Sequence, residues 1–229
     1  SLEGRVETPV SSDSGEETIV RLFSWIEGVA MICVPESARP VNPREMGGWL
    51  ARLALALRGL EHPARDYQLA YDPRHVATLE CFLPDIDDVV LREQCERLMH
   101  RYKSVVSPQL EAMPRQLVFN DLSPRNYIVD PDNVSKINGF IDFGDMLYTH
   151  TVNELAIAIA YAVMDKPDPL NAAARIVRGF HSVFPLTETE VEVLYTQVST
   201  RLLTTVTSAA INRQKNPDNE YLFVSEKPA

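Results

Sequence analysis

Two polar loops flank a short predicted β-hairpin, and this arrangement restricts the fold more than any other feature of the chain. The first loop runs from Asn120 to Asn126 and the second is Asp142-Phe143-Gly144-Asp145. Between them, 127–129 and 139–141 are apolar segments joined through the turn-forming sequence Asp-Pro-Asp-Asn. A hairpin of this kind would bury its strands and bring both loops to one place. We therefore expect their polar side chains to form one site.

The polar residues of these loops suit phosphoryl transfer from ATP to a hydroxyl group. That reaction needs a carboxylate near the hydroxyl proton and oxygen ligands for Mg²⁺. Asp121 and Asn126 have an Asp-x-x-x-x-Asn spacing, and Asp142 follows the hairpin. The spacing alone is common by chance, and Asp121 could simply cap a turn before Pro124. Its occurrence together with the hairpin and the second loop favours the catalytic interpretation.

The same residues resemble the aminoglycoside phosphotransferase family, which has the protein-kinase-like fold. The resemblance lies in residues 117–126 and 139–145 and in the continuation 149–156, where the family has an acidic residue followed by Leu-Ala at the start of a helix. It extends less specifically from Arg5 to the C-terminus. Within the family, the chain is most similar to hydroxylysine kinases and to kinase domains fused to class III aminotransferases.

The resemblance implies roles for particular residues. Asp121 would be the catalytic base, and Asn126 and Asp142 would be Mg²⁺ ligands. Asp145 would bind metal or substrate, or would be a solvated turn residue. Arg125 would steer substrate or phosphate from within the catalytic loop, with a solvated side chain as the alternative.

A hinge for the adenine of ATP is implied at residues 23–27. Phe23, Trp25 and Ile26 are the candidate cofactor-binding residues of this segment. The alternative for the two aromatic side chains, which we favour, is packing between two lobes.

Three features depart from the family pattern. Phe119 stands where the family usually has His, two residues before the catalytic Asp. The first lysine of the chain is Lys103, so no lysine on an N-terminal strand can hold the ATP phosphates, and only Gly4 and Gly15 precede the hinge. We expect residues 1–27 to be a remnant of the nucleotide-binding lobe and hinge, without its preceding strands, and residues 28–229 to be the helical catalytic lobe. The predicted fold class is α+β.

Local patterns predict the secondary structure on either side of the site. Residues 5–27 favour a strand pair, and the stretch 86–110 favours a helix. The predicted helix starts are Asn42 with Pro43, Asp168 with Pro169, and capping boxes at Thr151 with Glu154 and at Thr187 with Glu190. The Ala-rich stretch 155–163 is too short to span a membrane and predicts a buried helix. His150 and Glu154 also have the spacing of a metal pair, but no third ligand can be identified, so we prefer the cap.

The composition restricts the partners. A net charge of −10 disfavours a grip on nucleic acid, which needs clustered Lys and Arg. The three cysteines show no metal or disulfide spacing, and no apolar run has membrane-spanning length. We expect a cytoplasmic protein without nucleic-acid or membrane partners.

These observations lead to two functional hypotheses. The first is an ATP- and Mg²⁺-dependent kinase whose acceptor is an amino alcohol or a hydroxy amino acid such as hydroxylysine, with an aminoglycoside less favoured. The second is a catalytically silent kinase-like binding or regulatory module, which the missing lysine and Phe119 favour, and which could be part of a larger kinase–aminotransferase fusion. An incomplete β lobe would expose strand edges, so we also expect self-association or docking on a fused domain.

Overall fold

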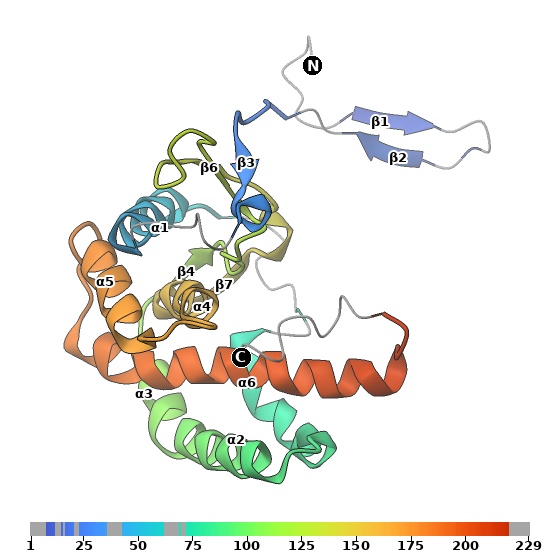
Figure 1. Ribbon diagram of the computed structural model, residues 1–229, viewed down its shortest axis with the longest axis vertical. Helices are drawn as coiled ribbons and strands as arrows, with labels where there is room; N and C mark the ends of the chain where they lie inside the picture. The colour runs from blue at the N-terminus through green and yellow to red at the C-terminus, as the bar shows by residue number, and fades with distance from the viewer. Residues whose placement is uncertain are drawn as a thin grey trace.

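The computed structural model describes residues 8–11, 15, 17–20, 23–35, 43–61, 69 and 72–219 (Figure 1). Its strands form three small antiparallel sheets. These are β1 (Thr8–Ser11) with β2 (Glu17–Val20), then β3 (Val29–Ala30), β5 (Tyr127–Val129) and β6 (Ile137–Phe140) in the order β3-β5-β6, and β4 (Arg115–Val118) with β7 (Leu147–His150).

Helices make up most of the remainder. The long ones are α1 (Pro43–Leu57), α2 (Val89–Arg101), α4 (Thr151–Val163), α5 (Pro169–His181) and α6 (Glu188–Lys215). Shorter or tighter turns are η1 (Met31–Cys33), η4 (Pro73–Asp85), η5 (Tyr102–Val106), α3 (Ser107–Leu110) and η6 (Phe143–Asp145). None of the helices in the described ranges is long and apolar enough to cross a membrane.

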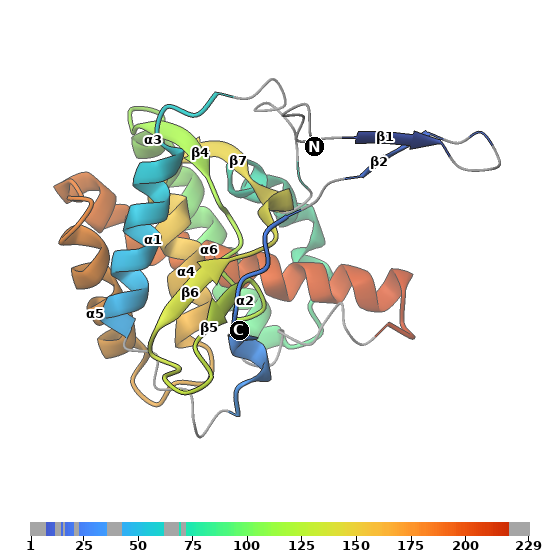
Figure 2. The same ribbon diagram turned by 90° about the horizontal axis from the view of Figure 1, so that it is seen from above.

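Helix α4 lies at the centre of the molecule. Its residues 151–160 are all buried, which confirms the prediction of a buried helix for residues 155–160 of the Ala-rich stretch, while 161–163 are half-buried. An apolar surface on every side of a helix requires neighbours on every side. Helices α5 and α6 and the β4–β7 pair provide them, and α1 packs in turn on α5 (Figure 2).

Two of the predicted helix starts are confirmed in atomic detail. The side chain of Asp168 accepts the N–H of Asn171 (3.1 Å) at the start of α5. At α6, Thr187 and Glu190 form a reciprocal capping box. Helix α1 begins at Pro43 as predicted, whereas its expected cap, Asn42, lies outside the described residues.

Two other helix predictions need correction. Helix α4 does begin at Thr151, but no side-chain cap is present there, so the predicted capping box with Glu154 is wrong. The helix expected over 86–110 begins later, at Val89, because the side chain of Asp88 accepts the N–H groups of Val90 and Leu91. After α2 the chain continues through the π-helical turn η5 and then through α3, which ends at Leu110.

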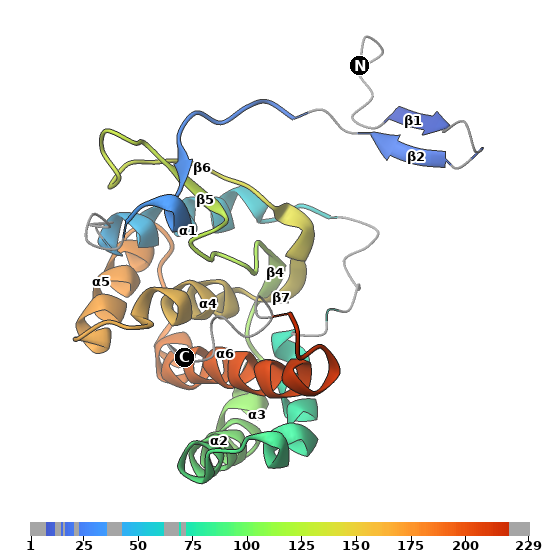
Figure 3. The same cartoon turned by 45° about the vertical axis from the view of Figure 1, so that its right-hand side comes forward.

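The predicted strand pair near the N-terminus is confirmed by β1 and β2. In all three ribbon views this hairpin stands outside the helical body (Figures 1 to 3). By contrast, β3 pairs with β5, so the chain from Val29 onward belongs to the body. The prediction of a hairpin before the second loop is also confirmed, by β5 and β6.

Candidate active site

The first polar loop leaves strand β4 and turns back toward β5. Within it, Nδ2 of Asn126 donates to the carboxylate Oδ2 of Asp121 (2.6 Å) and to the carbonyl of Asp121 (2.9 Å). Asn126 is buried and Asp121 is half-buried. The Asp-x-x-x-x-Asn spacing therefore places the two side chains in direct contact.

The second polar loop begins where the hairpin ends. The carbonyl of Asn126 accepts the N–H of Ile141 (3.0 Å), one step beyond the β5–β6 pair Tyr127↔Phe140. Asp142 follows immediately in a left-handed conformation (φ 64°), which Asp tolerates better than most residues. The negative charge of Asp145, two residues past Phe143, acts on Asp121. The expectation that the hairpin brings the two loops together is confirmed.

Glu154 binds the backbone of the first loop. Its Oε2 accepts the backbone N–H groups of Phe119 (2.5 Å) and Asn120 (3.2 Å), and its side chain is 1% exposed. Asn120 is left-handed (φ 68°). Non-glycine residues in this conformation gather at functional sites, where neighbouring groups hold them. Glu154 is the group that holds Asn120, which is its true role in place of the predicted cap.

The metal pair of His150 and Glu154, which we considered as the alternative to the cap, is not formed either. Nε2 of His150 accepts a hydrogen bond from Nε of Arg115 (3.1 Å), while Glu154 faces the loop backbone. Burial lowers the pKa of His150 to about 4, and burial raises the pKa of Glu154 to about 7. The imidazole is therefore neutral, and the carboxyl group titrates near neutral pH.

Two residues that the sequence analysis missed, Tyr161 and Arg201, complete the surroundings of Asp121. Tyr161 from α4 forms a side-chain hydrogen bond with Asp121, and Nη2 of Arg201 from α6 donates to the hydroxyl oxygen of Tyr161 (2.6 Å). Burial raises the pKa of Asp121, and the positive charge of Arg201 opposes this increase. One signal was available in the sequence, because Arg201 is the single basic residue between Glu188 and Asn212.

Phe119 belongs to an aromatic cluster. It is fully buried, and its ring meets Phe143 edge to face (5.0 Å between centroids) and Phe140 at a tilt (6.1 Å). Aromatic pairs of this geometry stabilise beyond their buried area. Phe119, which stands where the family usually has His, therefore connects the first loop to the second by packing on Phe143.

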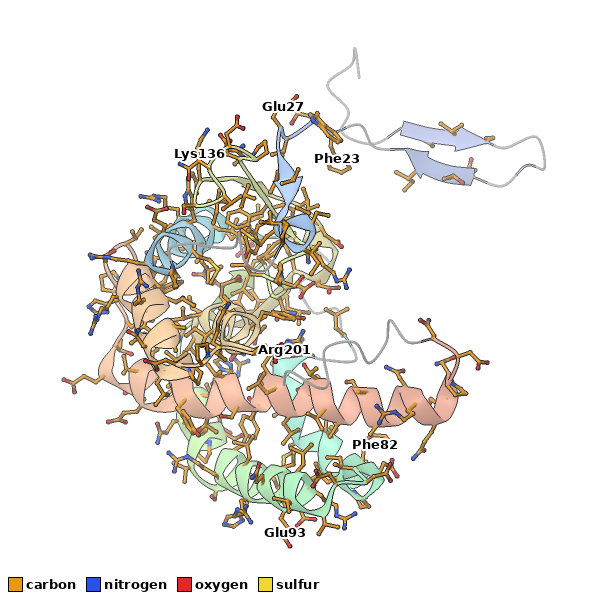
Figure 4. The ribbon with its side chains drawn as sticks, in the orientation of Figure 1. Phe23, Glu27, Phe82, Glu93, Lys136 and Arg201 are labelled. Carbon is orange, nitrogen blue, oxygen red and sulfur yellow. The ribbon has the colours of Figure 1, made fainter. Side chains whose placement is uncertain are left out.

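The predicted adenine hinge lies along the top of the body, next to β6 (Figure 4). Nδ2 of Asn138 donates to the carbonyl of Glu27 (2.9 Å), and Ile26 packs on Gly139. Phe23 and Trp25 are each 80% exposed, so the interpretation that they pack between lobes is wrong for the described residues. The structure brings Ile26 to the hairpin but leaves the two aromatic rings in solvent.

The polar groups fit a hard divalent cation. Asn126 uses its amide nitrogen for Asp121, which leaves its amide oxygen as the atom to face a metal, and Asp142 and Asp145 add carboxylates. Oxygen ligands of this kind suit Mg²⁺. Within the described ranges no three His, Cys, Asp or Glu side chains gather as a ready metal cluster. Arg125 is exposed at the edge of the loop.

Comparison with known proteins agrees with this geometry. The model of the phosphotransferase enzyme family matches residues 4–190. The chain belongs to this family. Hydroxylysine kinase of Mus musculus is 29% identical over 232 residues, which are 95% of this chain and 61% of that protein. The resemblance inferred from the motifs is thereby confirmed.

Solved structures of small-molecule phosphotransferases share the fold. The GDP complex of aminoglycoside 2'-phosphotransferase-IIIa has a TM-score of 0.60 at 14% identity, over 93% of this chain and 69% of that one. An amicoumacin kinase with AMP-PNP and Ca²⁺ has a TM-score of 0.61 at 14% identity, over 98% and 68%. The predicted α+β, protein-kinase-like fold is confirmed. The chain spans about three fifths of the length of the hydroxylysine kinases that it matches.

Proposed function

We propose that the protein transfers the γ-phosphoryl group of ATP to a hydroxyl of a small molecule, an amino alcohol or a hydroxy amino acid. The observation that carries this proposal is the Asp121–Asn126 hydrogen bond beside Asp142 at the end of the same hairpin. The similarity to hydroxylysine kinases supports the hydroxy amino acid. Family membership supports the reaction type.

Asp121 acts on the acceptor hydroxyl. Its carboxylate accepts hydrogen bonds from Asn126 and Tyr161, so it can orient the hydroxyl and accept its proton. A bound Mg²⁺, held by Asn126 and Asp142 with Asp145 nearby, would neutralise charge on the ATP phosphates. We infer that Arg125, which is exposed at the loop edge, binds an anionic group of either substrate.

Residues 23–27 provide the adenine hinge in this proposal. Ile26 is seated on the hairpin by Gly139, and the exposed rings of Phe23 and Trp25 offer apolar surface to a purine. In this proposal residues 1–27 belong to the nucleotide lobe and hinge, and residues 28–229 form the catalytic lobe.

The test is ADP release with a panel of hydroxylated amines and hydroxy amino acids. We expect Asp121→Asn to lower turnover by about 100-fold or more, because the base is lost while the side-chain shape is kept. Asp132→Asn, in the exposed turn of the same hairpin, is the matched control and should turn over normally. Normal turnover of Asp121→Asn would refute the role of the base. Absence of ADP release with every acceptor, together with absence of Mg-ATP binding in calorimetry, would refute the kinase function.

A further inference from the structure

Helix α6 places a cation beside the proposed catalytic base. Figure 4 shows Arg201 in the middle of this long helix, on the side that faces α4. Its guanidinium donates to Tyr161, and its charge acts on Asp121. An arginine is an unexpected neighbour for a base that would receive a purely cationic acceptor, because like charges disfavour such a complex.

The position of Arg201 is fixed by packing and hydrogen bonds. Its guanidinium lies against the ring of Tyr161, 5.3 Å from the centroid, in addition to the 2.6 Å hydrogen bond. One helical turn earlier, Nε2 of Gln197 donates to Asn153 (2.5 Å), whose Nδ2 donates to Thr149 (3.0 Å). These buried hydrogen bonds connect α6 to α4, and they fix the position of Arg201 relative to Asp121.

A small cavity lies behind the guanidinium. It measures about 10 Å³, and Asn153, Gln197 and Arg201 contribute to its lining. Oε1 of Gln197, a side chain that is 3% exposed, has no hydrogen-bond partner among the described residues. The cavity has the size of about one water molecule, which could serve that oxygen. It is too small for an acceptor.

We propose that Arg201, held by Tyr161, binds a carboxylate of the acceptor, and that the substrate class is the hydroxy amino acids. This rests on the proposed function. Guanidinium groups bind carboxylates through paired N–H donors, and such charge-assisted bonds are strong and specific. Hydroxylated amines without a carboxylate cannot form these bonds.

The reaction leaves that carboxylate unchanged. The hydroxyl oxygen of the acceptor attacks the γ-phosphorus of ATP, and the bond from that phosphorus to the β–γ bridging oxygen breaks. The hydroxyl proton passes to Asp121, and ADP departs with the electron pair of the broken bond. Arg201 contributes by fixing the distance between the carboxylate and the hydroxyl of the acceptor, which favours acceptors with one spacing between these groups.

The experiment compares three matched acceptors with the wild-type protein: 5-hydroxylysine, its methyl ester, and the amine left by removal of the carboxyl group. We expect the ester and the amine to lose about 30-fold or more in kcat/KM, mainly through KM. Arg201→Gln should lower kcat/KM for the acid to the level of the ester and change the ester little. Arg201→Lys should recover part of the loss, and Arg213→Gln, on the same helix, is the control.

Equal kcat/KM for the acid and the ester, or an equal loss for both in Arg201→Gln, would overturn the proposal while leaving the kinase function intact. If none of the three acceptors releases ADP and Mg-ATP does not bind in calorimetry, the kinase function is wrong. The carboxylate site can then be tested separately by calorimetry, which compares the affinities of the acid and the ester for wild type and for Arg201→Gln. The proposal requires that wild type binds the acid more tightly than the ester and that Arg201→Gln does not. Thermal melting of each variant shows whether it is folded. If Arg201→Gln is unfolded, the comparison uses Arg201→Lys instead.

Discussion

The carboxylate of Glu154 holds the main chain at Asn120. Oε2 accepts the Asn120 N–H at 3.2 Å, and Asn120 is left-handed with φ 68°. Asp121 is the next residue, so the orientation of the proposed base depends on the buried side chain of Glu154, which belongs to α4. An uncompensated buried N–H is costly, which makes this contact important for both stability and geometry.

Replacement of Glu154 should separate hydrogen bonding from charge. Glu154→Gln keeps an oxygen acceptor for the two loop N–H groups and should cost about 1 kcal/mol or less of unfolding free energy. Glu154→Ala leaves both donors unsatisfied and opens a cavity, which should cost about 3–5 kcal/mol. Urea denaturation measures both. Equal stability of the two variants would show that the loop does not depend on this acceptor.

The same substitution should change the pH dependence of stability. Burial raises the pKa of Glu154 from its ordinary value of 4.5 to about 7, with the nearby charge of Asp121 adding to the increase. The folded state therefore binds the proton more tightly than the unfolded state, so this group's contribution is full below pH 4.5, falls as pH rises to about 7, and is constant above. The whole change is at most about 3 kcal/mol.

Glu154→Gln removes this dependence, so its stability relative to wild type should increase between pH 4.5 and 7. His150 has the opposite sign, because its pKa is lowered to about 4 and its contribution is lost as pH falls from its ordinary value of 6.5. In Glu154→Gln the loss from His150 is no longer offset, and stability should fall more steeply on acidification than in wild type. Urea midpoints at several pH values measure this, and a constant difference between the two proteins would contradict it.

The parts of the site that sequence could predict are local in the chain. Asp121 and Asn126 are joined by one tight loop, and β5 and β6 by one turn, so their contact follows from short-range geometry. The capping box of Thr187 with Glu190 is local in the same sense. Such features depend on residues that are a few positions apart in the chain and not on how the rest of the chain packs.

The parts that sequence missed depend on tertiary packing. The spacing of Thr151 and Glu154 fits a capping box, but the β4–β7 pair places the loop backbone above Glu154, and two buried N–H groups bind the carboxylate instead. Tyr161 and Arg201 meet only because α4 and α6 cross, and no local pattern encodes that crossing.

Phe119 should not be exchangeable for the family's usual histidine. Phe119→His would place an imidazole among the rings of Phe140 and Phe143 in a fully buried position, and should cost about 1–3 kcal/mol of unfolding free energy. Phe119→Leu, which keeps the site apolar, is the control and should cost less. Denaturant titration compares them. A histidine variant as stable as wild type would show that the aromatic cluster accommodates a polar ring.

The contact between α1 and α5 gives the sharpest paired test of packing. A Cβ added at Gly47 would overlap the backbone carbonyl of Ile176 on α5, whereas a Cβ at Gly48 meets its nearest atom at 3.8 Å, an ordinary contact. Both residues lie inside α1, where Ala is favoured over Gly by about 1 kcal/mol.

Gly48→Ala should therefore be neutral or stabilising, and Gly47→Ala should destabilise by about 1–3 kcal/mol because backbone atoms must move apart. The two substitutions are chemically identical and adjacent, so the comparison of their thermal midpoints removes helix propensity from the result. If Gly47→Ala were as stable as Gly48→Ala, the helices would have to lie farther apart than the structure places them.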